Sequence, residues 1–372
     1  MSYFGKNIPK LGFGCMRFPK LENGEIDVET TKKMVDRFLE AGFTYFDTAY
    51  GYKDSEATLK TALVDRHPRE SYILATKLPA WLGAKNAEEA RQMFYTSLER
   101  TGAGYFDFYL LHNLGGSRTQ LYDDYDLWNF VAEQKEKGLI KHIGFSFHDN
   151  AEALDKVLTA HPEVEFVQLQ LNYADWESNS IQSKLCYRTA LKYNKPIIVM
   201  EPVKGGLLAN PPKTVREILK PIVKKASFAS FALRYVASLD NIITVLSGMS
   251  DMEQLEDNIA TFTDLKPFDA SERGAAECAQ LALSEMPTIP CTKCNYCTKD
   301  CPAGIPIPSF ISVLNGYTTF ENFDAAKADY AWPVKRSEKH ASDCIGCGNC
   351  ESVCPQHINI VDQMKKASEL FD

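Results

Sequence analysis

The first 265 residues alternate between short apolar runs and longer stretches whose apolar residues recur at helical spacing. Several of the short runs are almost continuously apolar, which is typical of parallel strands buried on both faces. The predicted strands cover residues 10–14, 44–49, 72–77, 107–112, 141–146, 166–172, 196–201 and 242–247. Eight strands, each followed by a helix over about 250 residues, predict a fold of the α/β class, a (β/α)₈ TIM barrel.

Helices are predicted between these strands, at residues 30–42, 86–102, 151–161 and 183–194. In the first, Met34, Val35 and Phe38 belong to an apolar stripe at three- and four-residue spacing. An open, doubly wound sheet is the alternative, and it would be expected to carry G-x-G-x-x-G between a strand and a helix. The stretch LGFGCM at residues 11–16 lacks the third glycine and a following helix, so the closed barrel is favoured.

Polar residues stand at the C-terminal ends of three predicted strands, where a barrel of this type carries its chemistry. They are Asp47, Lys77 and His112, and Tyr52 lies in the loop that follows Asp47. Each alone has a structural explanation, as a helix cap, a solvated lysine or a packed histidine. Their convergence on one rim predicts an active site.

The stretches FDTAYGYKDSE, ATK, LLH and GFS, in this order and spacing, resemble the aldo-keto reductases over residues 8–262. The resemblance implies an NAD(P)-dependent oxidoreductase that interconverts a carbonyl and an alcohol, with Tyr52 as the proton donor. A carbonyl that accepts hydride develops negative charge on oxygen, which a positioned donor neutralises. Because the ordinary pKa of tyrosine is about 10, we expect Lys77 to lower it, Asp47 to hold the ammonium and His112 to bind the substrate oxygen.

The resemblance also implies where NAD(P)H binds. It assigns Ser146 and Gln168 to the nicotinamide amide and the glycine-rich loop at residues 203–207 to the pyrophosphate. The complete set of implied cofactor-binding residues is Cys15, Met16, Ser146, Gln168, Met200, Val203, Lys204, Gly205, Gly206, Leu207, Gly248, Gln254, Asp257 and Asn258.

Several positions depart from the usual pattern of that family. Met200 stands in place of the aromatic residue under the nicotinamide ring, and Phe147 in place of an asparagine beside Ser146. Gly248 and Gln254 stand where a lysine and an arginine usually bind a 2′-phosphate. Since phosphate recognition draws on Arg or Lys, the choice between NADH and NADPH stays open.

Eight of the 11 cysteines form two runs with the spacing C-x₂-C-x₂-C-x₃-C-P, at residues 291–302 and 344–355. This is the ligand spacing of bacterial 4Fe–4S ferredoxins, in which the fourth cysteine of each run binds the other cluster. The predicted ligands are Cys291, Cys294, Cys297 and Cys354 for one cluster, and Cys344, Cys347, Cys350 and Cys301 for the other. A single zinc ion would instead need two separated cysteine pairs.

The spacer between the two runs predicts helical segments broken at Gly316, and it resembles the α-helical ferredoxin type found in iron–sulfur subunits of respiratory dehydrogenases. Residues 270–286 predict a connecting helix in which Cys278 packs as a small apolar residue. We therefore expect two domains, a barrel at residues 1–265 and a linker helix with the iron–sulfur domain at residues 266–372.

Composition narrows the functional classes. The net charge of −8 argues against general nucleic-acid affinity, and no apolar run approaches the roughly 18–20 residues of a membrane span. The N-terminus lacks the apolar core of a signal peptide, and thiolate-bound clusters favour a reducing compartment. These features predict a cytoplasmic enzyme with a small-molecule carbonyl or alcohol substrate and a redox protein as candidate partner.

Nicotinamide passes two electrons as hydride, whereas each cubane cluster normally passes one, so the sequence is compatible with three functions. The favoured one is a carbonyl reductase or alcohol dehydrogenase whose clusters transfer electrons or serve structure. The alternative is a ferredoxin-coupled oxidoreductase with a flavin or other mediator in the barrel, although no motif indicates flavin. A non-enzymatic electron carrier is disfavoured because the catalytic set is intact. The loop residues Trp81, Trp128 and Tyr122 are candidates for lining a substrate pocket or for loop packing.

Overall fold

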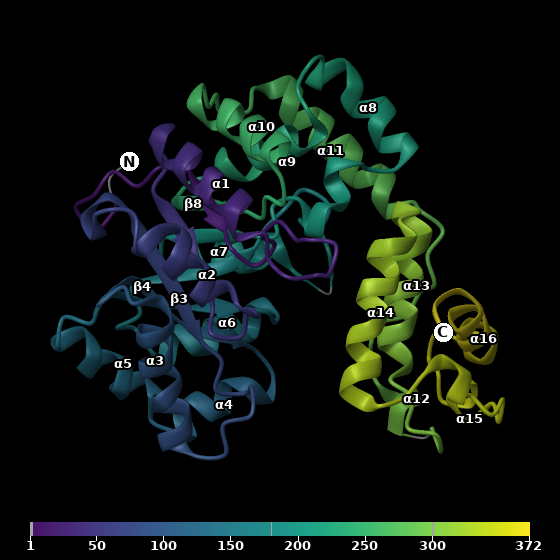
Figure 1. Ribbon diagram of the computed structural model, residues 1–372. Coiled ribbons are helices and arrows are strands. Elements are labelled where there is room, and N and C mark those ends of the chain that lie inside the picture. The colour runs from purple at the N-terminus through teal and green to yellow at the C-terminus, as the bar shows by residue number, and fades with distance from the viewer. Residues whose placement is uncertain (1–2, 180, 300) are drawn as a thin grey trace. The chain divides into compact units, whose positions relative to one another are not determined.

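The structure is a computed structural model that describes residues 3–179, 181–299 and 301–372 (Figure 1). The chain forms two compact units, one comprising the chain up to Gly205 with Ile222–Ala276, the other Gly206–Pro221 with Glu277–Asp372. The division falls inside helix α11 (Ala270–Ser284), C-terminal to the boundary expected at residues 265 and 266.

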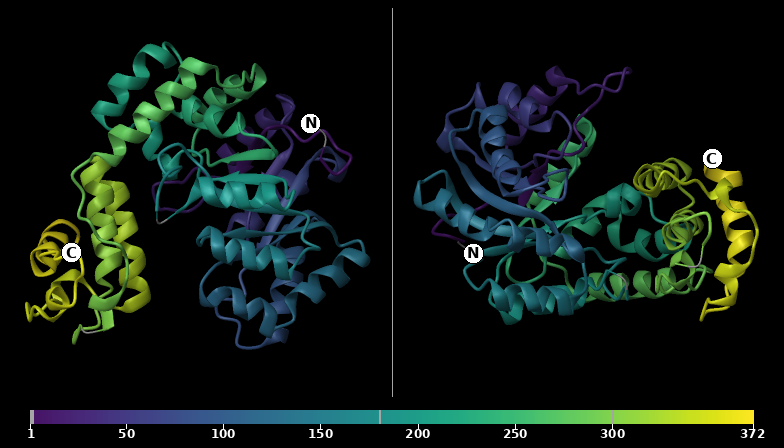
Figure 2. Two further views of the ribbon diagram at one scale, coloured as in Figure 1. Left: turned by 180° about the vertical axis from the view of Figure 1, so that it is seen from behind. Right: turned by 90° about the horizontal axis from the view of Figure 1, so that it is seen from below.

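The first unit contains a closed barrel of eight parallel strands in the order β1 to β8 (Figures 1 and 2). The strands are β1 (Leu11–Gly14), β2 (Tyr45–Asp47), β3 (Ile73–Leu78), β4 (Phe106–Leu114), β5 (Ile140–Phe147), β6 (Phe166–Gln170), β7 (Ile197–Met200) and β8 (Ile242–Ser247). The barrel closes where β1 pairs with β8, with Phe13 opposite Ser247. Each predicted strand overlaps one of these eight, so the predicted barrel is confirmed.

Helices cover the outside of the barrel, and the four predicted ones correspond to α1, α3, α6 and α7. The helices are α1 (Val28–Glu40), α2 (Ser55–Leu59), α3 (Ala87–Thr101), α4 (Ser117–Asp124), α5 (Leu127–Glu136), α6 (Ala151–Ala160), α7 (Ser183–Lys192), α9 (Phe228–Ala237) and α10 (Met252–Thr263). Helix α8 (Lys213–Val223) belongs mostly to the second unit. Side chains at the starts of α1, α3 and α6 accept hydrogen bonds from the first turn, which satisfies free amide groups there. These residues are Asp27, Asn86 and Asn150.

An aromatic and aliphatic cluster fills the interior of the barrel, and the N-terminal residues Tyr3 and Ile8 pack into it. In this cluster the ring of Phe166 passes so close to β5 that a Cβ at Gly144 would lie 2.5 Å from its Cζ. Only glycine leaves room for this ring. The buried polar residues Asp47 and Lys77 lie at the C-terminal ends of β2 and β3, where barrels of this type hold their active sites.

The second unit is helical, with α12 (Tyr296–Lys299), α13 (Ile307–Phe320), α14 (Phe323–Ser337), α15 (Asn349–Ser352) and α16 (Ile360–Phe371). Helices α13 and α14 lie side by side (Figure 1). The rings of Phe310 and Tyr330 stack across them at 4.6 Å, and Phe371 of α16 lies 5.4 Å from Tyr330. None of the described helices is long and apolar enough to cross a membrane.

Two expectations about this region were wrong. Helix α13 continues through Gly316 and ends at Phe320. The break follows because Glu321 adopts a left-handed conformation and Asn322 caps α14 by accepting a hydrogen bond from Ala325, so tertiary packing overrides the weak helix propensity of glycine. Cys278 on α11 is exposed and is not a packed core residue.

Replacing Gly144 by alanine is expected to destabilise the barrel. The new methyl group would meet the Phe166 ring and its carbonyl oxygen at 2.5–2.6 Å, and overpacking of this kind costs about 1–3 kcal/mol. Calorimetric melting should show a lower thermal midpoint for Gly144→Ala. The control is Gly274→Ala in α11, where no described atom lies within 4 Å of the new methyl group, and its midpoint should be unchanged or slightly higher. Equal midpoints for Gly144→Ala and the unaltered protein would contradict this account.

Candidate active site

A buried lysine lies at the centre of the polar end of the barrel. The Lys77 ammonium on β3 donates to the carboxylate of Asp47 on β2 and to the Thr48 carbonyl at 2.8 Å. It also approaches the Tyr52 hydroxyl at 3.3 Å. The rings of Tyr52 and His112 meet edge to face at 5.8 Å. The structure therefore brings together all four residues predicted as the catalytic set.

The loop after β2 fixes the position of Tyr52. Its amide donates to the Ala49 carbonyl at 3.0 Å, and its carbonyl accepts from the amide of Ser55, the first residue of α2. The Ser55 hydroxyl donates to the Cys15 carbonyl at 2.8 Å and also contacts the Thr48 hydroxyl at 2.8 Å. These bonds tie the loop to the end of β1 and aim the phenol at Lys77.

Burial and the neighbouring charge shift the pKa of Lys77 in opposite directions. Burial alone would lower the pKa of Lys77, but the adjacent Asp47 carboxylate outweighs it, so the pKa of Lys77 lies above its ordinary value. Burial raises the pKa of Asp47, and the ammonium opposes that rise. Lys77 is therefore a cation at neutral pH.

The structure corrects the expectation that the pKa of Tyr52 is lowered. Burial raises the pKa of Tyr52 above 10.0, and although Lys77 lowers it, Asp47 raises it further. The prediction that the ammonium makes Tyr52 more acidic than an ordinary tyrosine was therefore wrong in its net direction. Because its pKa is raised, Tyr52 is a protonated phenol at neutral pH and can act only as a donor until a partner takes its proton.

His112 is a neutral imidazole whose backbone carbonyl is hydrogen-bonded by two neighbouring side chains. Burial and the nearby Lys77 charge lower the pKa of His112 well below 6.5. Its carbonyl accepts from the Tyr122 hydroxyl at 2.5 Å and from the Trp81 indole at 2.9 Å. Among the described residues, its buried Nδ1 atom has no hydrogen-bond partner. Tyr122 and Trp81 thus position His112, whereas Trp128 stacks on His161 at 3.8 Å and serves packing.

Two predicted cofactor-binding residues face the same end of the barrel. Ser146 on β5 accepts a hydrogen bond from the Asn113 amide at 2.7 Å. Gln168 on β6 is buried beside Asp47 and helps to lower the pKa of that carboxyl, although burial dominates. Within the described part of the chain, Gln168 Oε1 and Asp47 Oδ2 are buried without partners. An amide-bearing ligand would satisfy the free Gln168 oxygen, so these residues fit a carboxamide group.

The other predicted cofactor-binding residues follow the first and seventh strands, and they differ in burial and in the unit to which they belong. Cys15 is buried and its thiol donates to the Phe13 carbonyl at 3.3 Å, whereas Met16 is 55% exposed. Met200 ends β7, with Val203 shortly after it. Gly206 and Leu207 fall in the second unit.

Lys204 is engaged within the protein. Its ammonium pairs with Asp175 at 2.6 Å, and the same carboxylate accepts from Asn172 and Gln170. These contacts keep the pKa of Asp175 low despite its burial. Gly205 after it is exposed and has a positive φ of 64°, which suits glycine. The predicted glycine-rich loop forms a short 3₁₀ helix, Lys204–Ala209.

The predicted adenosine-binding residues around α10 each have an internal partner. The Gln254 side chain accepts from the Ser250 amide at 2.9 Å and donates to the N-cap residue Asp251 at 2.8 Å. Asp257 accepts from the Ser227 hydroxyl at 2.6 Å, and the buried Asn258 donates to the Ser247 hydroxyl at 2.9 Å. The side chain of Arg17 lies against Gly248.

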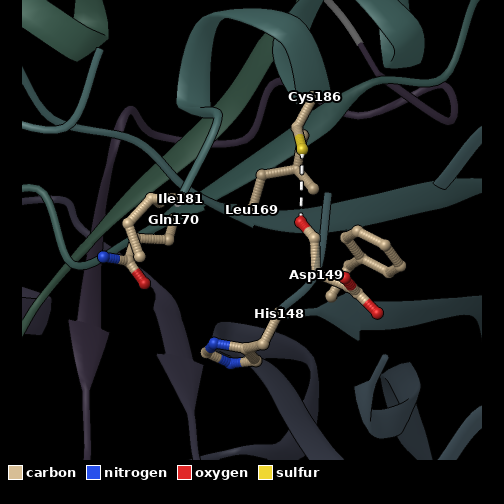
Figure 3. Close-up of a pocket in the computed structure, with 7 residues that line it drawn as sticks. His148, Asp149, Leu169, Gln170, Ile181 and Cys186 are labelled. Carbon is tan, nitrogen blue, oxygen red and sulfur yellow. Dashed lines mark hydrogen bonds between the residues drawn. The ribbon is translucent and has the colours of Figure 1, made fainter. Parts of the chain in front are cut away.

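A hollow lies at the ends of β5 and β6, where Figure 3 shows Cys186 donating to the Asp149 carbonyl at 3.6 Å. Its lining is Phe147, His148, Asp149, Leu169, Gln170, Ile181 and Cys186. Surrounding protein atoms and nearby Arg118 lower the pKa of His148 to about 4, although the residue is exposed to solvent. The sequence analysis did not identify His148 as a residue that lines this hollow. The available signal was its position directly after the fifth strand.

The eight cysteines of the two runs line two cavities in the second unit. One cavity is lined by Cys291, Cys294, Cys297 and Cys354, and the other by Cys301, Cys344, Cys347 and Cys350. Each combines three thiols of one run with the fourth thiol of the other, and apolar residues such as Ile311 and Val361 complete the walls. Four thiols around an apolar cavity fit an iron–sulfur cube. Among the described residues no three His, Cys, Asp or Glu side chains converge tightly enough for a single ion.

Comparisons with known proteins agree with both halves of this description. The Aldo/keto reductase family model matches residues 10–277, and a 4Fe-4S dicluster domain model matches residues 290–359. An aldo-keto reductase of Mycolicibacterium vanbaalenii is 28% identical over 262 residues, which are 68% of this chain and 83% of that protein.

Solved structures share the barrel. A holo aldo-keto reductase from Bacillus halodurans superposes with a TM-score of 0.58 at 23% identity, covering 73% of this chain and 92% of that one. A Klebsiella pneumoniae aldo-keto reductase in complex with NADPH gives 0.57 at 18% identity, covering 73% and 90%. The chain belongs to the aldo/keto reductase family of oxidoreductases, and in it a 4Fe–4S dicluster domain follows the barrel.

Proposed function

We propose that the barrel interconverts a small carbonyl compound and its alcohol with NAD(P)H, and that Tyr52 supplies the proton. The observation that carries this proposal is the Lys77 ammonium, which contacts both the buried Asp47 carboxylate and the Tyr52 hydroxyl. Family membership supports the reaction type, and the NADPH complex of the Klebsiella pneumoniae relative supports the cofactor.

Reduced nicotinamide, when bound, supplies the hydride. Tyr52 donates its O–H to the substrate oxygen as negative charge develops there, and the adjacent Lys77 ammonium stabilises the phenolate that remains. Asp47 holds the ammonium in place. His112, neutral because its pKa is lowered, can donate a ring N–H to the same oxygen without repelling the cation. Oxidation of an alcohol reverses these proton movements.

Ser146 and Gln168 hold the nicotinamide carboxamide in this proposal. The free Gln168 oxygen accepts from the carboxamide nitrogen, and the Ser146 hydroxyl, already an acceptor for Asn113, donates to the carboxamide oxygen. Both side chains come from strands that follow the His112 strand in the barrel. The carboxamide would therefore be held at the same end of the barrel as Tyr52.

The C-terminal unit holds two 4Fe–4S clusters in this proposal, one in each four-cysteine cavity. Bound clusters supply one-electron transfer. The thiols hold the iron, the apolar walls limit water, and a small redox protein is the partner that exchanges electrons with this unit. Counting iron and sulfide after anaerobic purification, together with extraction of any flavin, separates this proposal from a flavin-dependent barrel.

Tyr52→Phe is expected to abolish carbonyl reduction while sparing nucleotide binding. Loss of a positioned proton donor typically costs about 100- to 10,000-fold in rate, whereas the phenyl ring keeps the packing against His112. Turnover is followed by NAD(P)H oxidation and binding by nucleotide fluorescence. Tyr50→Phe, a neighbouring tyrosine that stacks with Arg100, is the matched control and should retain activity. Normal turnover by Tyr52→Phe would refute the assignment.

The rate of carbonyl reduction at saturating substrates is expected to be flat between about pH 6.5 and 9. Tyr52 stays protonated throughout because its pKa is raised above 10.0, and His112 stays neutral because its pKa lies well below 6.5. Activity should decline only as pH rises above about 10, where the donor loses its proton. The contrary outcome is a decline in rate centred near pH 8 that does not depend on the buffer and that disappears in His112→Asn. It would show that His112 changes protonation within the range where it is expected to stay neutral.

Cysteine replacements test the crossed ligand sets by iron content. Cys354→Ala should lose about four of eight irons, and adding Cys294→Ala should remove no more, since both line one cavity. Adding Cys347→Ala to Cys354→Ala should instead remove nearly all iron, because Cys347 lines the other cavity. The exposed Cys278→Ala is the control and should keep full iron. The reverse pattern of the two double variants would show that each run binds its own cluster.

A further inference from the structure

Arg17 lies across two loops at the C-terminal end of the barrel. A Cβ at Gly248, directly after β8, would lie 3.3 Å from Arg17 Cδ and 3.6 Å from its Cγ. A Cβ at Gly205, in the loop after β7, would lie 3.5 Å from a terminal guanidinium nitrogen of the same side chain. The Arg17 carbonyl accepts from the Ser250 hydroxyl at 2.9 Å, which anchors this segment beside β8.

The Arg17 guanidinium is an available cation. Its side chain is exposed, and it has no ion pair or hydrogen bond with any residue that the structure describes. The Glu201 carboxylate also lies beside Gly205, at 3.7 Å from the same Cβ position, but no ion pair joins it to Arg17 among the described side chains. Lys204, a cation in the segment after β7, forms an ion pair with Asp175.

Loops after the seventh and eighth strands form a recurring phosphate site in barrels of this type. Arginine recognises phosphate through two parallel N–H donors. Gly205 is exposed and has no side chain to cover the guanidinium beside it. The stem of Arg17 lies on Gly248 and its charged tip on Gly205. A phosphate that meets this tip sits at the loop after β7.

We propose that Arg17 binds the pyrophosphate of the nicotinamide dinucleotide. This inference rests on the proposed function and adds to it a residue that the set predicted from sequence does not include. Pyrophosphate is common to NADH and NADPH, so the contact contributes equally to both nucleotides. Together with the uncharged Gly248 and Gln254, it makes the protein able to bind either form with little preference.

The test measures dissociation constants of NADH and NADPH for the full chain with its iron–sulfur unit intact, by anaerobic fluorescence titration. Arg17→Gln is expected to weaken both nucleotides by the same factor, about tenfold for one charge-assisted contact. Arg17→Lys should recover part of the loss, because it keeps the charge but not the paired donors. Lys20→Gln, which removes an exposed cation from the same loop, is the control and should bind like the unaltered protein.

Each other result overturns the inference. Weaker binding of NADPH alone would place Arg17 at the 2′-phosphate, and unchanged binding of both nucleotides would remove it from the site. A loss in Lys20→Gln equal to that in Arg17→Gln would reveal only a general effect of charge. If the unaltered protein bound neither nucleotide, the proposed function would fall with it, whereas binding that ignores Arg17 leaves that function standing.

Discussion

The buried pair of Lys77 and Asp47 is the constraint on which the candidate active site depends. An ammonium only 1% exposed is tolerable because a carboxylate and the Thr48 carbonyl replace its water. Burying such a pair contributes little to stability, since desolvation offsets the attraction. In the proposed reaction its value is electrostatic: a fixed cation beside Tyr52 would stabilise negative charge that forms only during the reaction. Burial and this cation together lower the pKa of His112, whereas burial raises the pKa of Tyr52 although the cation opposes that rise.

The closed barrel explains how residues distant in sequence meet at that cation. Parallel pairing of β2 with β3 and of β3 with β4 brings Asp47, Lys77 and His112 to consecutive strand ends. The aromatic cluster around Phe108 and Phe166 fills the interior below them. Because that cluster is closely packed, the polar residues are supported from beneath and cannot retreat into a void.

Sequence patterns predicted most of this arrangement and missed what depends on three-dimensional packing. The strands were found because runs buried on both faces carry their own signal. The meeting of Asp47, Lys77 and His112 was predicted because each stands near a strand end, and Tyr52 because it lies in the loop after β2. The net direction of the Tyr52 pKa was wrong because burial arises from segments far apart in the chain. The support of His112 by Trp81 was missed because it acts on a backbone carbonyl. An exposed loop arginine such as Arg17 has no distinguishing sequence signal.

The crossed cysteine cavities make the C-terminal unit interdependent. Cys354 stands beside thiols that precede α13, and Cys301 beside thiols that follow α14, so neither cavity is complete until the two helices pair. The stacked rings of Phe310 and Tyr330 hold that pairing. In the proposed holo protein, metal binding and folding would be coupled: iron bound at either cavity would join both runs, and opening of the helix pair would weaken both cavities at once. The long spacer, more than a compact ferredoxin needs, supplies this helix pair as a rigid support for the two cavities.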